Sequence, residues 1–191
     1  MIKKLVLLFL INILSGTSFS QENYLYKSLE EALSANPDSV YRLDLSRNQL
    51  KTVPEELIQF KNLRELDLSK NKLTELPETL IFEHLEVINL TKNKFEVFPT
   101  VICKNTALKQ ILLGKNSLTE IPECISNLKE LVILDVWFNL VTEIPASMVK
   151  LKKLRSFDLR GMSYSEEFQK KWRELLPWVK IEFDLGCDCG I

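Results

Sequence analysis

The sequence predicts an α/β fold in which one short structural unit repeats along the chain and stacks on itself. Two observations lead to this class. A unit of 22 or 23 residues recurs from Val40 to about Gly161, and an Asn and a Pro keep the same place in five consecutive units. A unit of this size cannot bury its own apolar face, so successive turns have to stack around one continuous core. We therefore expect a solenoid with a cap at each end.

Residues 1–20 have the pattern of a secretory signal peptide. Lys3 and Lys4 precede an apolar run from Leu5 to Leu14, and small residues follow up to Ser20. A membrane anchor is the alternative, but it needs about 17 to 25 apolar residues, and this run is shorter. We expect cleavage after Ser20, no membrane span in the mature chain, and export to the medium or to the periplasm and cell envelope.

The charge of the chain excludes one class of partner. The net charge of the whole chain is −1, and it becomes −3 when the first 20 residues and their two lysines are removed. Proteins that bind nucleic acids through the phosphate backbone usually present a strongly basic surface. Nucleic acid is therefore not an expected partner.

Residues 21–39 are expected to form an N-terminal helical cap. Ser28 and Glu31 have the spacing of a capping box, and the helix should end before Pro37. The apolar residues expected on one face of this helix are Leu25, Leu29, Ala32 and Leu33. That face would cover the first turn of the repeat, since an uncapped solenoid exposes its core.

Each repeat between residues 40 and 161 predicts one strand. The unit begins LxxLxLxxN, and its second and third leucines alternate with polar residues, which is typical of a strand buried on one face. Because every turn runs in the same sense, the strands should pair in parallel.

Two polar or rigid positions in the unit have structural explanations. An Asn amide at the end of each strand can satisfy buried backbone groups along the stack. A Pro later in each unit, with its fixed φ, can start a short helical or 3₁₀ segment on the outer side. The expected Asn ladder consists of Asn48, Asn71, Asn93, Asn116 and Asn139. The prolines are Pro54, Pro77, Pro99, Pro122 and Pro145.

This pattern resembles the leucine-rich repeat family, in the variant whose units carry an LPxxL segment. The resemblance covers five full units and a degenerate sixth, in which Met162 replaces the Asn. It implies a right-handed solenoid with a parallel sheet on its concave side and short helical or 3₁₀ segments on its convex side. It also implies a concave surface of the kind that commonly binds another protein, without a cofactor.

Residues 162–191 are expected to form the C-terminal cap, a helix followed by a strand. The helix should place Phe168, Trp172 and Leu175 on one face. The strand should alternate Val179, Ile181 and Phe183 toward the core.

The outward positions of the strands predict a binding surface. The first two units place charged residues there, whereas later units place apolar ones, and a clustered apolar patch with a polar rim is typical of a contact site. The predicted apolar contacts are Val87, Leu112, Ile133, Trp137 and Phe138, and the predicted polar rim is Asp135, Asp158 and Arg160.

Local packing is the alternative explanation of the two aromatic residues. Trp137 stands beside Gly114 on one neighbouring strand and beside Arg160 on the other, so its indole can lie over the glycine and stack under the guanidinium. Phe138 stands beside Gly161 and can pack on the C-terminal cap.

A basic edge accompanies the strands. It consists of Arg47, Lys70, Lys92 and Lys115, and Lys72 and Lys94 extend it. Such an edge can attract an anionic protein or glycan, or it can simply be a solvated face that keeps the strands soluble.

The cysteines leave two questions open. Cys103 and Cys124 lie on the convex side of consecutive units, where a disulfide can form if the side-chain directions match. Cys187 and Cys189 are spaced CxC, which lacks the second half of a zinc site. Neither pair predicts a metal centre.

No catalytic motif is present, so we expect a protein that is not an enzyme. His84 is the only histidine, and no phosphate-binding loop or HExxH motif occurs. The predicted function is protein binding through the concave face. The alternatives are a carbohydrate-binding protein in which Trp137 stacks on a sugar, and a structural component of the envelope or matrix.

Overall fold

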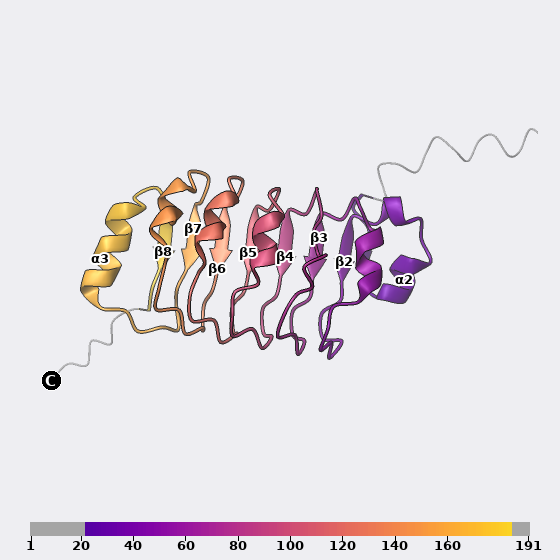
Figure 1. Cartoon of the computed structure of the whole chain (residues 1–191), viewed down its shortest axis with the longest axis horizontal. Coiled ribbons are helices and arrows are strands. Elements are labelled where there is room, and N and C mark those ends of the chain that lie inside the picture. Colours follow the sequence, from indigo (N-terminus) through magenta and orange to yellow (C-terminus); the bar gives the residue numbers. More distant parts are fainter. Residues whose placement is uncertain (1–21, 185–191) are drawn as a thin grey trace, which may run out of the picture.

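A computed structural model of the chain describes residues 22–184. They form a single sheet of eight parallel strands that pair in the order of the sequence (Figure 1). The strands are β1 (Leu25–Tyr26), β2 (Arg42–Asp44), β3 (Glu65–Asp67), β4 (Val87–Asn89), β5 (Gln110–Leu112), β6 (Ile133–Asp135), β7 (Ser156–Asp158) and β8 (Lys180–Glu182). The predicted solenoid with a parallel sheet is confirmed. The predicted signal peptide lies outside the described residues, as do Cys187 and Cys189.

The alternation of apolar and polar residues explains how the strands face the core. In β2 through β7 the central residue is buried and the residues on either side are half-buried. The next leucine, such as Leu45 or Leu68, is buried as well. These inward side chains join into one apolar core that runs the length of the solenoid. Each turn therefore depends on its neighbours for burial.

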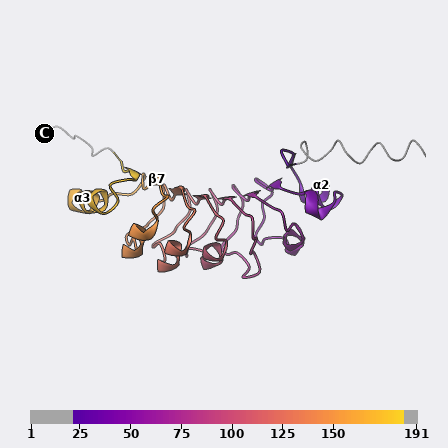
Figure 2. The same ribbon diagram turned by 90° about the horizontal axis from the view of Figure 1, so that it is seen from above.

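The outer side of the solenoid carries short 3₁₀ segments, each directly after a proline. They are η2 (Glu55–Gln59), η3 (Thr100–Lys104), η4 (Glu123–Asn127) and η5 (Ala146–Lys150). Figure 2 shows these segments on one side of the sheet only. The unit of 22 residues differs, because Pro77 is followed by a turn in which Leu80 N–H donates to the Pro77 carbonyl at 2.9 Å.

The N-terminal cap contains a helix, but its apolar face differs from the prediction. Helix α2 (Leu29–Leu33) starts at Ser28, whose hydroxyl accepts a hydrogen bond from Glu31 N–H at 3.1 Å. Ala32 is fully buried, whereas Leu33 is 43% exposed. Leu25 lies in β1 instead of the helix, because it pairs with Arg42 at the edge of the sheet. A short 3₁₀ turn, η1 (Pro37–Ser39), then leads into the first unit.

The C-terminal cap contains the predicted helix and strand. Helix α3 (Glu166–Leu175) starts at Ser165 and buries Trp172. Leu175 is 38% exposed, and Leu176, directly after the helix, is fully buried in its place. Strand β8 pairs with β7 and buries Ile181, so it extends the sheet by one strand. Among residues 22–184, no helix is long and apolar enough to cross a membrane.

The ladder asparagines tie each turn to the one before it. The Asn71 amide donates to the carbonyls of Leu45 and Leu68 at 2.9 Å, and its oxygen accepts from Asn48 N–H at 3.0 Å. The amides of Asn93, Asn116 and Asn139 donate to the equivalent pairs of carbonyls in successive units. Asn48 is exposed, because no repeat unit precedes it.

Two further features hold consecutive turns together on the convex side. Cys103 and Cys124 are joined by a disulfide, with their Cα atoms 5.8 Å apart. Asn105, which sequence reasoning did not single out, is 2% exposed. Its amide donates to the carbonyls of Leu80 and Val101 at 3.1 Å. Both features join neighbouring units through groups that lie next to each other only because the turns stack.

Candidate interaction surface

We use the term open face for the face of the sheet opposite the 3₁₀ segments, which corresponds to the expected concave surface. The strand register sorts its side chains into columns. The first column holds Arg42, Glu65, Val87, Gln110, Ile133, Ser156 and Lys180. The second column holds Asp44, Asp67, Asn89, Leu112, Asp135, Asp158 and Glu182.

The acidic residues of the second column have a structural role. Asp44, Asp67, Asp135 and Asp158 each accept, through one carboxylate oxygen, a hydrogen bond from the backbone N–H two residues later. This local bond turns the chain out of the strand. Asn89 makes the same bond with Thr91 N–H at 3.1 Å. The acids recur in this column because each one accepts a backbone hydrogen bond, and no ligand is needed to explain them.

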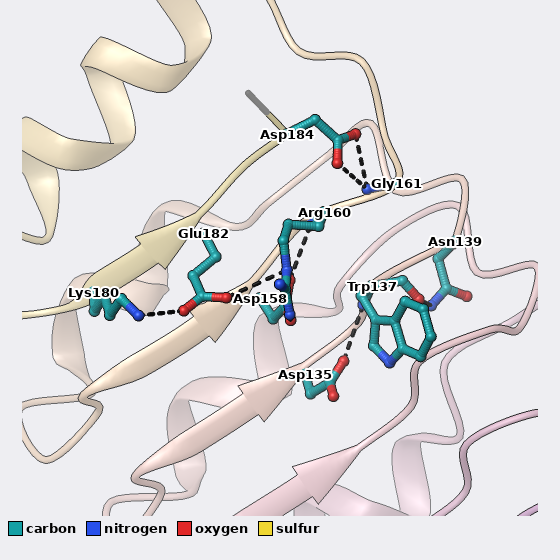
Figure 3. Close-up of polar contacts among 9 residues, drawn as sticks. All are labelled: Asp135, Trp137, Asn139, Asp158, Arg160, Gly161, Lys180, Glu182 and Asp184. Atoms are coloured by element: carbon teal, nitrogen blue, oxygen red, sulfur yellow. Dashed lines mark hydrogen bonds and ion pairs between the residues drawn. The ribbon is translucent and has the colours of Figure 1, made fainter. Parts of the chain in front are cut away.

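The predicted polar rim gathers around Arg160 (Figure 3). The Arg160 guanidinium pairs with Asp158, with Nη2 and Oδ2 2.5 Å apart, and with Glu182, with Nε and Oε2 3.3 Å apart. Glu182 also accepts from Lys180 Nζ at 2.5 Å. Lys180 and Glu182 were absent from the predicted site. The alternation of the closing strand could have revealed them, because it places both residues on the outward face.

Asp135, next to this cluster, is half-buried. Burial raises the pKa of its carboxyl to about 6, although the hydrogen bond from Trp137 N–H opposes that change. The neighbouring carboxylate of Asp158 raises the pKa further, and the Arg160 guanidinium lowers it. Near neutral pH, the ionised carboxylate of Asp135 would therefore be stabilised by an approaching cation, or relieved of its charge by a proton.

Trp137 is half-buried because its indole lies over Gly114. A Cβ atom on Gly114 would stand 2.0 Å from Trp137 Nε1, so no larger residue fits under the ring as placed. Arg160 is held by its carboxylates, and the cation over the indole is Lys115, with Nζ 4.7 Å from the ring centroid. Trp137 therefore packs on its own strand neighbour, as the local-packing explanation expected, but under a different cation.

Phe138 is 56% exposed and stands in a costly backbone conformation. Its φ is 50°, in the left-handed region that bulky residues rarely adopt. Its ring packs on Gly161, where a Cβ would lie 2.5 Å from Phe138 Cδ2. It also meets the Trp137 ring edge-on, with centroids 5.3 Å apart. The glycine contact holds the ring at the C-terminal cap.

The remaining predicted apolar contacts are half-buried on the open face and do not form one block. Val87 and Ile133 share the first column but are separated by Gln110. Leu112 pairs with Asp135 in the second column, so it lies diagonally from Ile133. The structure thus places Leu112 on β5 and Ile133 on the neighbouring β6, with Trp137 two residues after β6, and it leaves Val87 at the margin.

A groove that sequence reasoning missed lies beside this surface. It has a volume of about 460 Å³ and is lined by Leu140, Val141, Met162, Tyr164 and Phe168, among others. The Tyr164 hydroxyl donates to the Val141 carbonyl at 2.6 Å, and its ring stacks on Phe168 with centroids 4.4 Å apart. Burial raises the pKa of the Tyr164 phenol. The aromatic residues of SYSEEF, next to the degenerate sixth unit, were the available signal.

Metal chemistry has no candidate in the described part of the chain. Residues 22–184 contain no group of three or more His, Cys, Asp or Glu side chains that could hold a metal ion. His84 is exposed in the connection between the second and third units. The acids of the second column hold backbone N–H groups or pair with Arg160, as described above.

Comparison with known proteins agrees with this architecture. The family model described as "Leucine rich repeat" matches residues 21–73 and 38–95. A solved leucine-rich repeat protein from Leptospira interrogans is 31% identical over 85% of this chain, with a TM-score of 0.63. The chain belongs to the leucine-rich repeat family. Folds of this family commonly serve as protein-interaction modules and are generally not enzymes.

A second solved structure shares the fold of this leucine-rich repeat protein. Internalin C2 from Listeria monocytogenes is 20% identical, with a TM-score of 0.63 over 83% of this chain. The match spans 46% of the Leptospira protein and 66% of the internalin, so both relatives are longer than the matched region. No curated protein sequence matches the chain.

Proposed function

We propose that this leucine-rich repeat protein is an exported, non-catalytic module that binds another protein through the C-terminal half of its open face. The apolar contacts of the site are Val87, Leu112, Ile133, Trp137 and Phe138, and its polar contacts are Asp135, Asp158 and Arg160. One observation carries the proposal. The 3₁₀ segments cover only one face of the sheet, and no described element covers Leu112 and Ile133 on the other.

The chemistry of the site favours a partner with a cationic side chain next to an apolar one. Leu112 and Ile133 offer a dry surface, and Asp135 beside them is a desolvated carboxylate whose pKa is raised to about 6. A Lys or Arg of the partner would replace the lost hydration of that carboxylate. Central apolar anchors inside a charged rim are the usual arrangement of an interaction hot spot.

Carbohydrate binding is less well supported by the surroundings of Trp137. The indole lies over Gly114 and under the Lys115 ammonium, and these contacts occupy surface that a sugar ring would stack on. We therefore place the partner among proteins. The export of the chain rests on the sequence of residues 1–20, which lie outside the described residues.

The test compares two doubly substituted chains in a quantitative pull-down from the medium and envelope of the source cells. Leu112→Ser with Ile133→Ser removes the apolar centre. Gln110→Ser with Glu65→Ser shortens two polar side chains of the same face and serves as the matched control. We expect the first variant to lose roughly tenfold or more of a captured protein, since each central anchor contributes about tenfold. The control should retain it.

A photoreactive residue at Gln110 locates the contact directly. It should cross-link the captured protein, whereas the same residue at Lys104 on the convex side should not. Equal capture by both doubly substituted chains, or cross-linking only from Lys104, would place the interaction elsewhere. Binding to a glycan array that Trp137→Ala abolishes would replace the protein partner by a sugar.

A further inference from the structure

The bends that follow the strands carry a second surface, distinct from the open face. In each unit the residues immediately before and after the ladder Asn are exposed at this edge, toward which the strand arrows point in Figure 1. The first four units place mainly cations there, and the fifth places Phe and Leu. We define the rim strip as Arg47, Lys70, Lys72, Lys92, Lys94, Lys115, Phe138 and Leu140.

The six cations of the rim strip have no acidic partners among the described residues. Elsewhere in the chain, Lys104, Lys109 and Lys153 each pair with a glutamate of the preceding turn. Within residues 22–184, no carboxylate lies within 4.0 Å of a rim-strip cation. Lys72 Nζ reaches only the Gln49 amide oxygen, at 3.2 Å. The positive charge of the strip is therefore available to a ligand.

The backbone keeps these charges in one row. Arg47, Lys70, Lys92 and Lys115 all have φ between 55° and 60°, because each occupies the same left-handed position at the end of its strand. Equivalent residues of neighbouring units stand about 4.8 Å apart, so like charges face one another along the edge. Glutamates such as Glu75 and Glu96 follow the cations of these bends by two or three residues. They form no ion pair with the row.

The other end of the rim strip is apolar. Phe138 is 56% exposed and Leu140 is 61% exposed, although both belong to large apolar residue types. Phe138 holds the same left-handed position as the four cations. Leu140 also lines the groove of about 460 Å³ against the C-terminal cap. Within residues 22–184, a row of cations without carboxylate partners thus leads into two exposed apolar side chains and an apolar recess. The last of these cations, Lys115, lies over the rings of Trp137 and Phe138.

We propose that the rim strip docks the protein onto an anionic lipid bilayer. Phe138 and Leu140 would enter the boundary between headgroups and acyl chains, and the six cations would lie over anionic headgroups. Exposed apolar residues combined with a basic patch are the two signals that together give stable attachment of a peripheral protein. Apart from Phe138, which both surfaces include, the residues of the open face would remain free, so lipid binding and the proposed protein binding are separate functions.

Other partners fit the composition of the strip less well. Protein interfaces are depleted in lysine, and five of the six cations here are lysines. A lysine next to a bilayer keeps its hydration and its mobility, because its ammonium can remain among the headgroups. A soluble polyanion would use the cations but would leave Phe138 and Leu140 without a role.

The test measures co-sedimentation with vesicles. The chain without residues 1–20, which keeps every described element, is mixed with vesicles of equal parts phosphatidylglycerol and phosphatidylcholine, or of phosphatidylcholine alone. We expect binding to the anionic vesicles at least tenfold stronger than to the neutral ones, weakening with salt. The fluorescence of Trp137, next to Phe138, should shift to shorter wavelength on binding.

Two variants separate the contributions. Lys70→Gln with Lys92→Gln should lose about 25-fold in vesicle affinity, since each lysine near an anionic surface contributes about fivefold. Lys104→Gln with Lys153→Gln makes the same change of net charge away from the strip and should bind as wild type does. Phe138→Asn with Leu140→Ser should lose at least tenfold, and Asn tolerates the left-handed backbone at residue 138. Circular dichroism establishes that each variant is folded.

Three results would overturn the proposal. The first is an absence of binding to phosphatidylglycerol vesicles by the wild-type chain. The second is an equal loss in the Lys104 and Lys153 control, which would make the attraction a property of net charge alone. The third is unchanged vesicle binding in the Phe138 and Leu140 variant together with tight binding to dextran sulfate, which would identify the strip as a site for soluble polyanions. None of these assays depends on the protein partner of the open face.

Discussion

The N-terminal and C-terminal halves of the open face share one backbone and one register but differ in how their side chains are satisfied. In the N-terminal half, Arg42 and Glu65 face each other across β2 and β3 and form an ion pair with Nε and Oε2 2.7 Å apart. In the C-terminal half, Trp137 lies over a glycine and Asp135 is desolvated. The repeat therefore fixes where each outward side chain stands, and a few residues that differ between units decide the chemistry of the face.

The largest expected effect concerns the ladder, where interior and terminal turns should differ. Asn139→Ala removes an amide that is 4% exposed and bonded to Leu113 and Val136. Because it leaves buried backbone groups unpaired, we expect the free energy of unfolding to fall by about 3 kcal/mol. Asn48→Ala, at the exposed end of the ladder, should cost less than about 0.5 kcal/mol. Urea denaturation measures both, and equal losses would contradict the role of the preceding turn.

The next effect tests whether Trp137 depends on Gly114. Gly114→Ala places a Cβ about where Trp137 Nε1 stands, so the indole has to move. We expect a loss of about 2 kcal/mol in the free energy of unfolding and a red shift of Trp137 fluorescence. In a Trp137→Ala background the same substitution should cost less than about 0.5 kcal/mol. Ser46→Ala, in the equivalent column of the N-terminal half, is the control for the position itself.

A smaller effect concerns the pH dependence of stability in the C-terminal half. The pKa of Asp135 is about 6 in the folded chain and lower in the unfolded chain, so the folded state binds the proton more tightly. Stability should therefore increase as the pH falls from 7.5 through 6, and the gain should be complete below the unfolded pKa of about 3.9.

Asp135→Asn should remove that dependence. An Asn keeps the acceptor for Trp137 N–H, as Asn89 does for Thr91 N–H in its own unit. At pH 7.5 we expect a gain of about 1 to 2 kcal/mol, after allowing for partial exposure of the carboxyl. Asp44→Asn makes the same exchange in the N-terminal half and reports the cost of an amide at this position. Thermal unfolding between pH 4 and 8 is the measurement, and parallel profiles of wild type and Asp135→Asn would refute the assignment.

The smallest effect belongs to the ion pair of the N-terminal half. The side chains of Arg42 and Glu65 are 34% and 42% exposed, so solvent screens their attraction. Arg42→Ala should lower the free energy of unfolding by less than about 1 kcal/mol, and the loss should shrink in 1 M salt. A loss as large as that of Gly114→Ala would mean that the two halves of the face do not differ as described.

The site was predicted from sequence less completely than the fold. The outward positions followed from the alternation of each strand, because side chains of a strand point to opposite faces. The contacts between columns did not follow, since Lys115 reaches over Trp137 and Arg160 turns to Asp158 and Glu182 instead. Such choices depend on distances between side chains of different turns and on competition among several charged partners.

The caps show the same limit. The capping box at Ser28 was readable from local spacing, because it involves residues of one helical turn. The placement of Leu25 in β1 was not, since its partner Arg42 lies 17 residues further along the chain. Leu176 is in the core instead of Leu175 for a related reason, since the place where α3 ends depends on how the helix packs on the last turn of the solenoid.

By itself, the sequence determined the number of turns, the strand in each turn, the buried leucines and the place of the ladder asparagines. These follow from periodicity, because a unit repeated in phase can bury its leucines only by stacking on its neighbours. The tertiary structure decided that Trp137 covers Gly114, which was one of two arrangements that the sequence left open. It alone decided that Asp135 is desolvated and that, within residues 22–184, the six rim cations have no carboxylate within 4.0 Å. Those outcomes depend on which side chains meet across turns 22 or 23 residues apart, and no local pattern encodes that.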